Sequence, residues 1–142
     1  DKALEIDPKY AKAWYNKGTA LVWLSRYQEA VKCYDRALEI DPKFALAWLN
    51  KGVALGQLGR YQEAIKCYDR ALEIDPEFAM AWSNMGWILG KMGRPPEEEF
   101  TCYEMALEID PKHIPSWSKN GMLLSELPRY IEVEKAVLGL QK

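Results

Sequence analysis

The stretch that decides the fold is DRALEIDPKF at residues 35–44, because nearly the same ten letters occur four times. It recurs as DRALEIDPEF at 69–78, opens the chain as DKALEIDPKY at 1–10, and returns as EMALEIDPKH at 104–113. The Asp-Pro pairs in these copies are spaced by 34, 34 and 35 residues. An interval of this size predicts a stacked array of repeats, because one unit cannot bury its own apolar face.

The composition is that of a globular protein. The 142 residues are 49% hydrophobic and 28% charged, and the net charge of −2 gives no basic excess for nucleic acid or an anionic membrane. No apolar run approaches the roughly 18 residues that a membrane helix needs. Three cysteines, an odd number, favour a reducing compartment over a disulfide framework, so we expect a cytoplasmic protein. The first residue is Asp rather than Met, which indicates a start inside a longer protein.

Each repeat predicts two helices. Residues 43–58 carry Trp48, Leu55 and Leu58 at helical spacing, a Gly-Arg pair interrupts the pattern, and residues 61–74 form a second amphipathic segment. The LEIDP segment is the predicted junction between repeats. We expect its Asp to cap the next helix by accepting from free backbone N–H groups, and its Pro to lie in the first turn of that helix.

The repeated positions resemble the tetratricopeptide (TPR) pattern. They are Trp14, Gly18, Leu21, Tyr27, Ala30, Tyr34, Ala37 and Pro42 in repeat one, and Trp48, Gly52, Leu55, Tyr61, Ala64, Tyr68, Ala71 and Pro76 in repeat two. The resemblance covers essentially the whole chain. It implies an all-α fold, an α-solenoid of helix-turn-helix repeats wound as a right-handed superhelix with a concave inner surface.

The chain is therefore interpreted as a single TPR domain. Its parts are the end of a preceding repeat (1–10), repeat one (11–44), repeat two (45–78), repeat three with a one-residue insertion near 95–96 (79–113), and a degenerate fourth repeat with capping helices (114–142). Within repeat three, Glu99 falls where Ala30 and Ala64 lie in the other repeats. A carboxylate is costly to bury unpaired, so we expect this turn to splay or shift.

No catalytic or metal-binding pattern is present in the sequence. The only histidine, His113, occupies a slot that holds Tyr or Phe in the other repeats, so we expect a packing ring. Cys33, Cys67 and Cys102 share one position on the second helix, and a helix-to-helix distance exceeds the reach of a disulfide. There is no Gly-rich phosphate loop, Cys/His metal spacing or Ser/His/Asp set, so we expect no enzyme activity, metal or cofactor.

The candidate binding residues lie on the face of each first helix that the stack leaves over. Helical spacing places four positions of each repeat on this face: two before the Trp, and two, five and nine after it. The resemblance to TPR proteins implies that this face is the concave, ligand-binding one. The residues at these positions are Lys12, Asn16, Thr19 and Trp23; Leu46, Asn50, Val53 and Gln57; Met80, Asn84, Trp87 and Lys91; and Pro115, Lys119, Met122 and Glu126, with Tyr15, Leu49 and Ser83 in flanking positions.

Two features of this face suggest a ligand. Asn16, Asn50 and Asn84 recur once per repeat, and a ladder of amides can hold the backbone of an extended peptide, as in the asparagine ladders of peptide-binding TPR arrays. Contacts between helices are the alternative role for these asparagines. The apolar and aromatic residues around them are of the kinds that interfaces enrich.

The sequence favours one function and leaves two others open. TPR modules that hold the acidic tails of chaperones use a clamp of Lys, Asn and Arg, whereas this chain has Tyr15, Thr19, Met80 and Asn84 at those positions. We therefore expect a non-catalytic scaffold that binds an apolar or amphipathic segment of a protein partner, and neither nucleic acid nor a membrane. The alternatives are self-assembly through the repeat ends or the C-terminal helix, and a substrate-recruiting arm of a larger enzyme.

Overall fold

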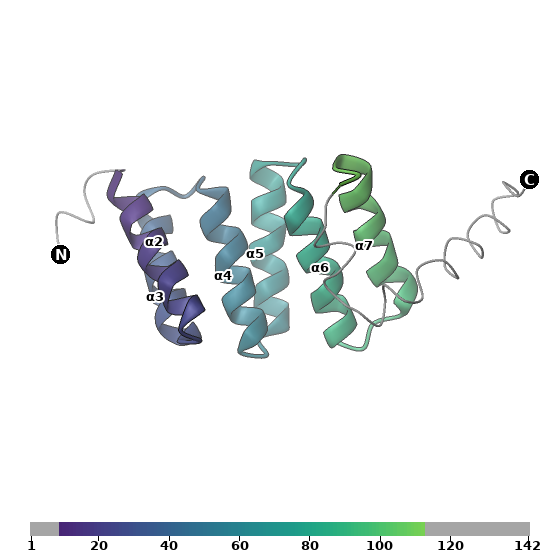
Figure 1. Ribbon diagram of the computed structural model, residues 1–142, viewed down its shortest axis with the longest axis horizontal. Coiled ribbons are helices and arrows are strands. Elements are labelled where there is room, and N and C mark those ends of the chain that lie inside the picture. The colour runs from purple at the N-terminus through teal and green to yellow at the C-terminus, as the bar shows by residue number, and fades with distance from the viewer. Residues whose placement is uncertain (1–8, 113–142) are drawn as a thin grey trace, which may run out of the picture.

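The computed structural model describes residues 9–112, which form an all-α stack without strands (Figure 1). Its helices are α2 (Lys9–Trp23), α3 (Tyr27–Ile40), α4 (Ala45–Gln57), α5 (Tyr61–Ile74), α6 (Ala79–Lys91) and α7 (Pro96–Ile109). The predictions for the chain ends, including the preceding repeat, the fourth repeat with its capping helices and the role of His113, lie outside the described residues.

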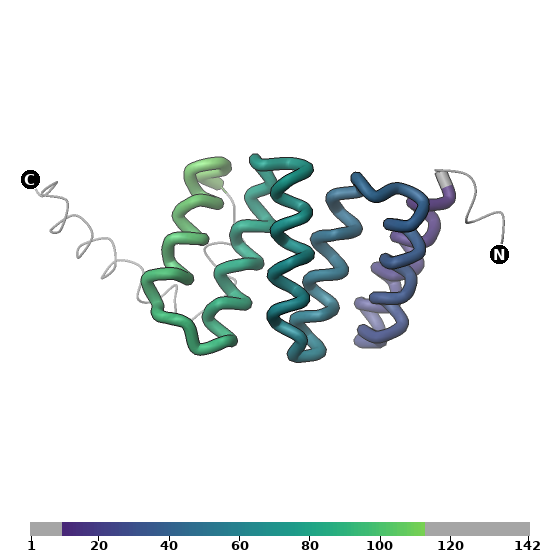
Figure 2. Tube along the Cα trace, turned by 180° about the vertical axis from the view of Figure 1, so that it is seen from behind, coloured from purple at the N-terminus to yellow at the C-terminus, as the bar shows by residue number. Residues whose placement is uncertain are grey.

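The helices form two layers. Helix α2 pairs with α3, α4 with α5 and α6 with α7, and each second helix then packs against the next first helix (Figures 1 and 2). Successive first helices also contact each other, α2 with α4 and α4 with α6, whereas successive second helices within the described residues touch little or not at all. The layer of α2, α4 and α6 is therefore the inner side of the curve. The predicted all-α solenoid is confirmed.

Glycines and tyrosines set the spacing within each hairpin. Each first helix turns a glycine toward a tyrosine of the following second helix; the pairs are Gly18–Tyr34, Gly52–Tyr68 and Gly86–Tyr103. A Cβ atom added to Gly52 would lie 2.5 Å from Cε1 of Tyr68. Since Ala30 and Ala64 of the second helices are also fully buried, small residues let the two helices approach closely.

The prediction that the Asp of LEIDP caps the next helix is wrong. The carboxylate of Asp41 accepts the backbone N–H of Lys43 at 3.1 Å, and its carbonyl accepts the N–H of Phe44 at 3.2 Å. Helix α4 begins only at Ala45, so Pro42 lies in the turn between helices. The same carboxylate bond recurs at the other two described junctions. The Asp closes a turn because the chain needs three more residues to reverse before a helix can start.

The expected splaying of repeat three is also wrong. The α6–α7 hairpin packs as extensively as α4–α5, and the extra residue is absorbed in the loop 92–95. Glu99 is buried, and its Oε2 accepts a hydrogen bond from the Tyr103 hydroxyl at 3.2 Å. A Cβ atom on Gly90 would lie 2.6 Å from Oε1 of Glu99, so the missing side chain makes room for the carboxylate. Space and a hydrogen-bond donor together lower the cost of burial without moving the helices.

Candidate peptide-binding face

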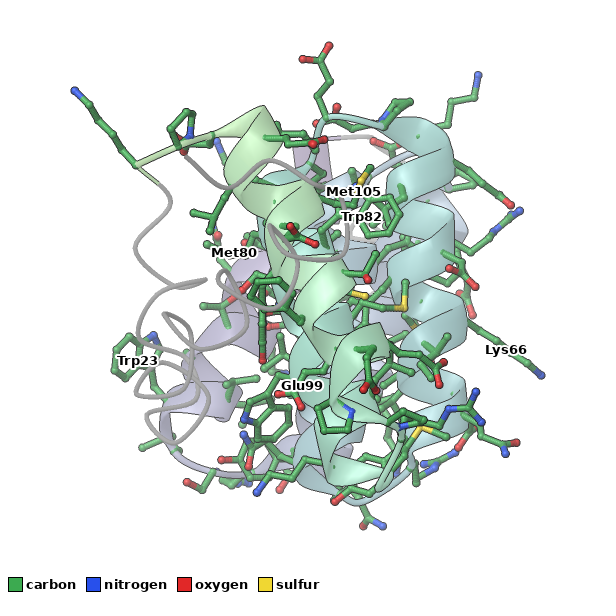
Figure 3. The ribbon with its side chains drawn as sticks, turned by 90° about the vertical axis from the view of Figure 1, so that its right-hand side faces the viewer. Trp23, Lys66, Met80, Trp82, Glu99 and Met105 are labelled. Atoms are coloured by element: carbon green, nitrogen blue, oxygen red, sulfur yellow. The ribbon has the colours of Figure 1, made fainter. Side chains whose placement is uncertain are left out.

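We use the name inner face for the exposed side of α2, α4 and α6. Each of these helices presents one exposed apolar side chain there: Trp23 is 85% exposed, Leu46 45% and Met80 38%. Figure 3 shows Trp23 and Met80 on one side of the stack and Lys66 of α5 on the opposite side. Among the other predicted residues of this face, Lys12, Asn16, Gln57 and Lys91 are exposed, and Tyr15, Thr19, Asn50, Val53 and Trp87 are half-buried.

Leu49 does not belong to the exposed surface. Its side chain is only 1% exposed, and it lies in a core cluster with Leu55 and Tyr68. The equivalent residue of repeat one, Tyr15, packs its ring 4.9 Å from the ring of Phe44. This helix position therefore points into the junction with the next repeat, and the expectation that Leu49 is exposed is wrong.

The three asparagines have three different surroundings. Asn16 is exposed, whereas Asn84 is buried. The side chain of Asn50 donates a hydrogen bond from Nδ2 to the Tyr15 hydroxyl at 2.8 Å, which links α4 to α2. At Asn50 the structure therefore shows the contact between helices that the sequence analysis gave as the alternative to peptide binding. Equal spacing in the sequence has not produced three equivalent amides.

The tyrosine hydroxyls facing this layer also differ from repeat to repeat. The Tyr34 hydroxyl lies 3.0 Å from Oγ1 of Thr19. In repeat two, Val53 occupies the place of Thr19, and within residues 9–112 the Tyr68 hydroxyl has no hydrogen-bond partner. Burial raises the pKa of Tyr34 to about 12 and raises that of Tyr68 as well, so both stay protonated. The sequence contained the signal for this difference in the change from Thr to Val.

A small cavity opens beside the Tyr68 ring. Its volume is about 40 Å³, and its walls come from α4, α5 and α6; they are Val53, Gln57, Tyr68, Asn84 and Trp87. This space suits a single methyl group or one polar atom. The ammonium of Lys91 lies over the Trp87 ring, 5.2 Å from its centre, in a cation–π contact. The inner face thus combines exposed apolar side chains with one pocket of mixed polarity.

The described residues show no reactive centre. Residues 9–112 contain no group of three side chains arranged to ligate a metal, and none of their helices has the length and apolarity to cross a membrane. Cys33, Cys67 and Cys102 are buried free thiols. Burial raises the pKa of Cys67 and Cys102 to about 11, so at neutral pH both remain protonated and are poor nucleophiles.

Comparison with known sequences establishes the family. Residues 11–44 and 45–78 each match the tetratricopeptide repeat, and residues 67–100 match a further description of the same repeat. These matches together extend over more than half of the 142 residues, so the chain belongs to the tetratricopeptide repeat family. An uncharacterized protein of Methanocaldococcus jannaschii, MJ0572, is 50% identical over 34 residues, which are 24% of this chain and 40% of that protein. The chain thus spans well under half the length of that relative.

Solved structures share the fold. The first TPR domain of Spaghetti (RPAP3), bound to the HSP90 peptide SRMEEVD, superposes with a TM-score of 0.76 at 21% identity, over 90% of this chain and 98% of that chain. The Arabidopsis OM64 TPR domain gives 0.76 at 20% identity, over 84% and 98%. MamA gives 0.68 at 26% identity, over 75% and 61%. The shared TPR fold suggests a role in protein–protein interaction.

Proposed function

We propose that this chain is a non-catalytic interaction scaffold, and that its inner face holds an apolar or amphipathic peptide segment of another protein. The observation that carries the proposal is the exposed apolar side chains of the first helices: Leu46 and Met80 in the first turns of α4 and α6, and Trp23 at the end of α2. When a partner covers exposed apolar surface of this kind, removal of that surface from water makes the free energy of binding more favourable. Leu49 is buried in the core and is not part of this surface.

The charges of the inner face favour an apolar ligand over an acidic one. The Spaghetti domain is bound to an HSP90 peptide whose sequence, SRMEEVD, is rich in carboxylates. In this chain the middle helix presents no charge on the face, where Leu46, Asn50 and Val53 lie. Lys12 lies on α2 at one end of the face and Lys91 on α6 at the other, so the uncharged surface of α4 separates the two cations. A carboxylate would therefore find no cluster of cations to bind it.

The pocket beside Tyr68 gives this face a specific feature. The Tyr68 hydroxyl, which has no hydrogen-bond partner within residues 9–112, can donate to a carbonyl group of a bound peptide, while the Trp87 ring contacts a neighbouring apolar side chain of that peptide. A cytoplasmic location is part of the proposal, and the three free, buried cysteines are its support.

The test uses peptides as probes. We would select binders from a phage library of random short peptides on the 142-residue chain, and measure the affinity of synthetic copies by fluorescence polarisation. The probe variant is the double change Leu46→Lys and Met80→Lys. Gln28→Lys and Gln62→Lys add the same charge at exposed positions of the second helices and serve as the matched control.

We expect apolar-rich binders whose affinity falls about tenfold or more in the probe variant and stays the same in the control. Circular dichroism checks that both variants are folded. The proposal fails if the probe variant and the control bind alike. Its preference for apolar segments fails if SRMEEVD binds more tightly than the selected peptides and loses affinity in a Lys12→Ala, Lys91→Ala variant.

A further inference from the structure

A second candidate surface lies on the outer side of the stack, where the second helices separate. A groove of about 410 Å³ opens between α3 and α5, and α4 forms its floor. Val31 and Asp35 line it from α3, Trp48, Lys51 and Leu55 from α4, and Glu63, Lys66, Cys67 and Arg70 from α5, with Arg60 at one end. At Arg70 it meets a second hollow of about 390 Å³, lined also by Pro42, Lys43, Glu73 and Ile74.

The charges of this outer groove are not balanced. Every carboxylate in it already has a cation: Asp35 accepts from Lys51 at 2.7 Å, Glu63 is paired with Arg60, and Glu73 with Arg70 at 3.2 Å. Lys43 and Lys66 also line the two hollows, and no carboxylate of residues 9–112 lies within salt-bridge distance of either ammonium. The groove therefore carries an excess of positive charge on a chain whose net charge is −2.

The floor of the groove is built around Trp48. Its ring is half-buried, and the ammonium of Lys51 and the guanidinium of Arg70 each lie 5.5 Å from its centre. Its indole N–H donates to the carbonyl of Pro42 at 2.9 Å, which fixes the ring. Cations held against an aromatic ring beside the apolar side chain of Leu55 can accept a segment that is acidic and carries an apolar residue.

The repeat pattern does not require these cations. One repeat further on, Met85, Thr101 and Met105 stand where repeat two has Lys51, Lys66 and Arg70. Met105 of α7, labelled in Figure 3, is the residue of repeat three that is equivalent to Arg70, and its side chain is apolar. Residues 9–112 contain two intervals between successive second helices, and only the one between α3 and α5 carries these cations, although repeat one has the same residue types at Lys17, Lys32 and Arg36.

We propose that the outer groove docks an acidic peptide segment of a partner protein, with carboxylates bound to Lys66 and to the guanidinium nitrogens of Arg70 that Glu73 does not occupy, and an apolar side chain against Trp48. This site is independent of the inner face, so a partner could bind there whether or not the inner face holds a ligand.

The chain contains its own control. Helix α3 repeats the sequence of α5 almost letter for letter, and its Lys32 and Arg36 stand at the positions of Lys66 and Arg70. Both are exposed, and neither lines the outer groove. Exchanging Lys32 and Arg36 for Glu therefore makes the same change of charge, on the same kind of helix, outside the groove.

The experiment uses a fluorescein-labelled peptide of repeated Glu-Glu-Leu units, with a Gln-Gln-Leu peptide as the neutral comparison. We expect the acidic peptide to bind the whole chain, to weaken as NaCl is raised, and to lose about tenfold or more in affinity with Lys66→Glu and Arg70→Glu. With Lys32→Glu and Arg36→Glu the affinity should stay within about twofold, because exposed charges outside a site contribute little. On titration of the wild type, the indole N–H signal of Trp48 should move in NMR spectra while that of Trp23 stays.

Any of four results with the peptides would overturn the proposal. They are equal losses in the two double variants, equal binding of the neutral peptide, no binding at all, and a Trp48 signal that does not move. Competition by a single-stranded RNA oligonucleotide that depends on Lys66 and Arg70 would assign the groove to nucleic acid instead, and would also overturn it.

Discussion

Replacing Tyr34, Tyr68 and Tyr103 by Phe, one at a time, removes the same oxygen atom from three equivalent positions with different neighbours. The Tyr34 hydroxyl pairs with Thr19 at 3.0 Å, and that of Tyr103 donates to the buried carboxylate of Glu99 at 3.2 Å. The Tyr68 hydroxyl has no partner among residues 9–112, so the three changes should differ in their effect on stability.

The magnitudes follow from what each change leaves behind. Tyr34→Phe removes one neutral hydrogen bond and should lower the free energy of unfolding by about 0.5–1.5 kcal/mol. Tyr103→Phe leaves a buried carboxylate short of a donor and should lower it by about 1.5–3 kcal/mol. Tyr68→Phe removes a hydroxyl that no group of residues 9–112 satisfies, so the free energy of unfolding should stay within about 0.5 kcal/mol of the wild type or rise.

Urea unfolding followed by circular dichroism measures these differences, provided that the slope of free energy against urea is the same in all four proteins. The order Tyr103, Tyr34, Tyr68, from most to least destabilising, would support the hydrogen-bond assignments. If Tyr68→Phe were as costly as Tyr34→Phe, the Tyr68 hydroxyl would have a partner in the folded chain, and the pocket would lose the donor that we assign to it.

Three further predictions concern the backbone, the inner face and the thiols. Ser25 has φ 59° where Gly59 has φ 77°, so Ser25→Gly should raise the thermal midpoint through about 0.5–1 kcal/mol of added stability and Gly59→Ser should lower it; the opposite signs would contradict the strain argument. Leu49→Lys should cost more than about 3 kcal/mol because it places a charge in the core, while Leu46→Lys should change urea stability by less than about 0.5 kcal/mol; similar effects at both positions would refute the burial pattern. Since burial raises the folded pKa of Cys67 and Cys102 from 9.0 to about 11, the unfolded chain loses these protons first. Stability should therefore fall as the pH rises from about 9 to about 11, and fall less in a Cys67→Ala, Cys102→Ala variant; equal falls in both proteins would contradict the pKa shifts.

The hairpins and their order could be predicted from the sequence because they depend on periodicity, which one chain displays by itself. The role of Asp41 could not, because an Asp accepts backbone N–H groups equally well in a turn and at a helix start. Only the path of the chain, which brings the N–H of Lys43 to the carboxylate, decides between the two.

The candidate site was predictable only in outline. Leu46 and Leu49 lie three residues apart on one helix, and helix geometry alone gives both a place near the inner face. The structure separates them because the next repeat covers one and not the other. Glu99 shows the same limit: its burial depends on the space left at Gly90, which lies on the other helix of the same hairpin. The repeat pattern of the sequence does not show which side chains meet when one helix packs against another, within a repeat or between repeats.

The most direct test of the central claim, that the inner face is the binding surface, is an NMR titration of the whole chain with a peptide selected on it. The tryptophan indole N–H signals report on both sides of the stack. Our account predicts that the signals of Trp23 and Trp87 move in proportion to bound peptide, while that of Trp48, bonded to Pro42 on the outer side, stays in place. Movement of Trp48 without Trp23 and Trp87 would contradict the account and place peptide binding on the other side of the molecule.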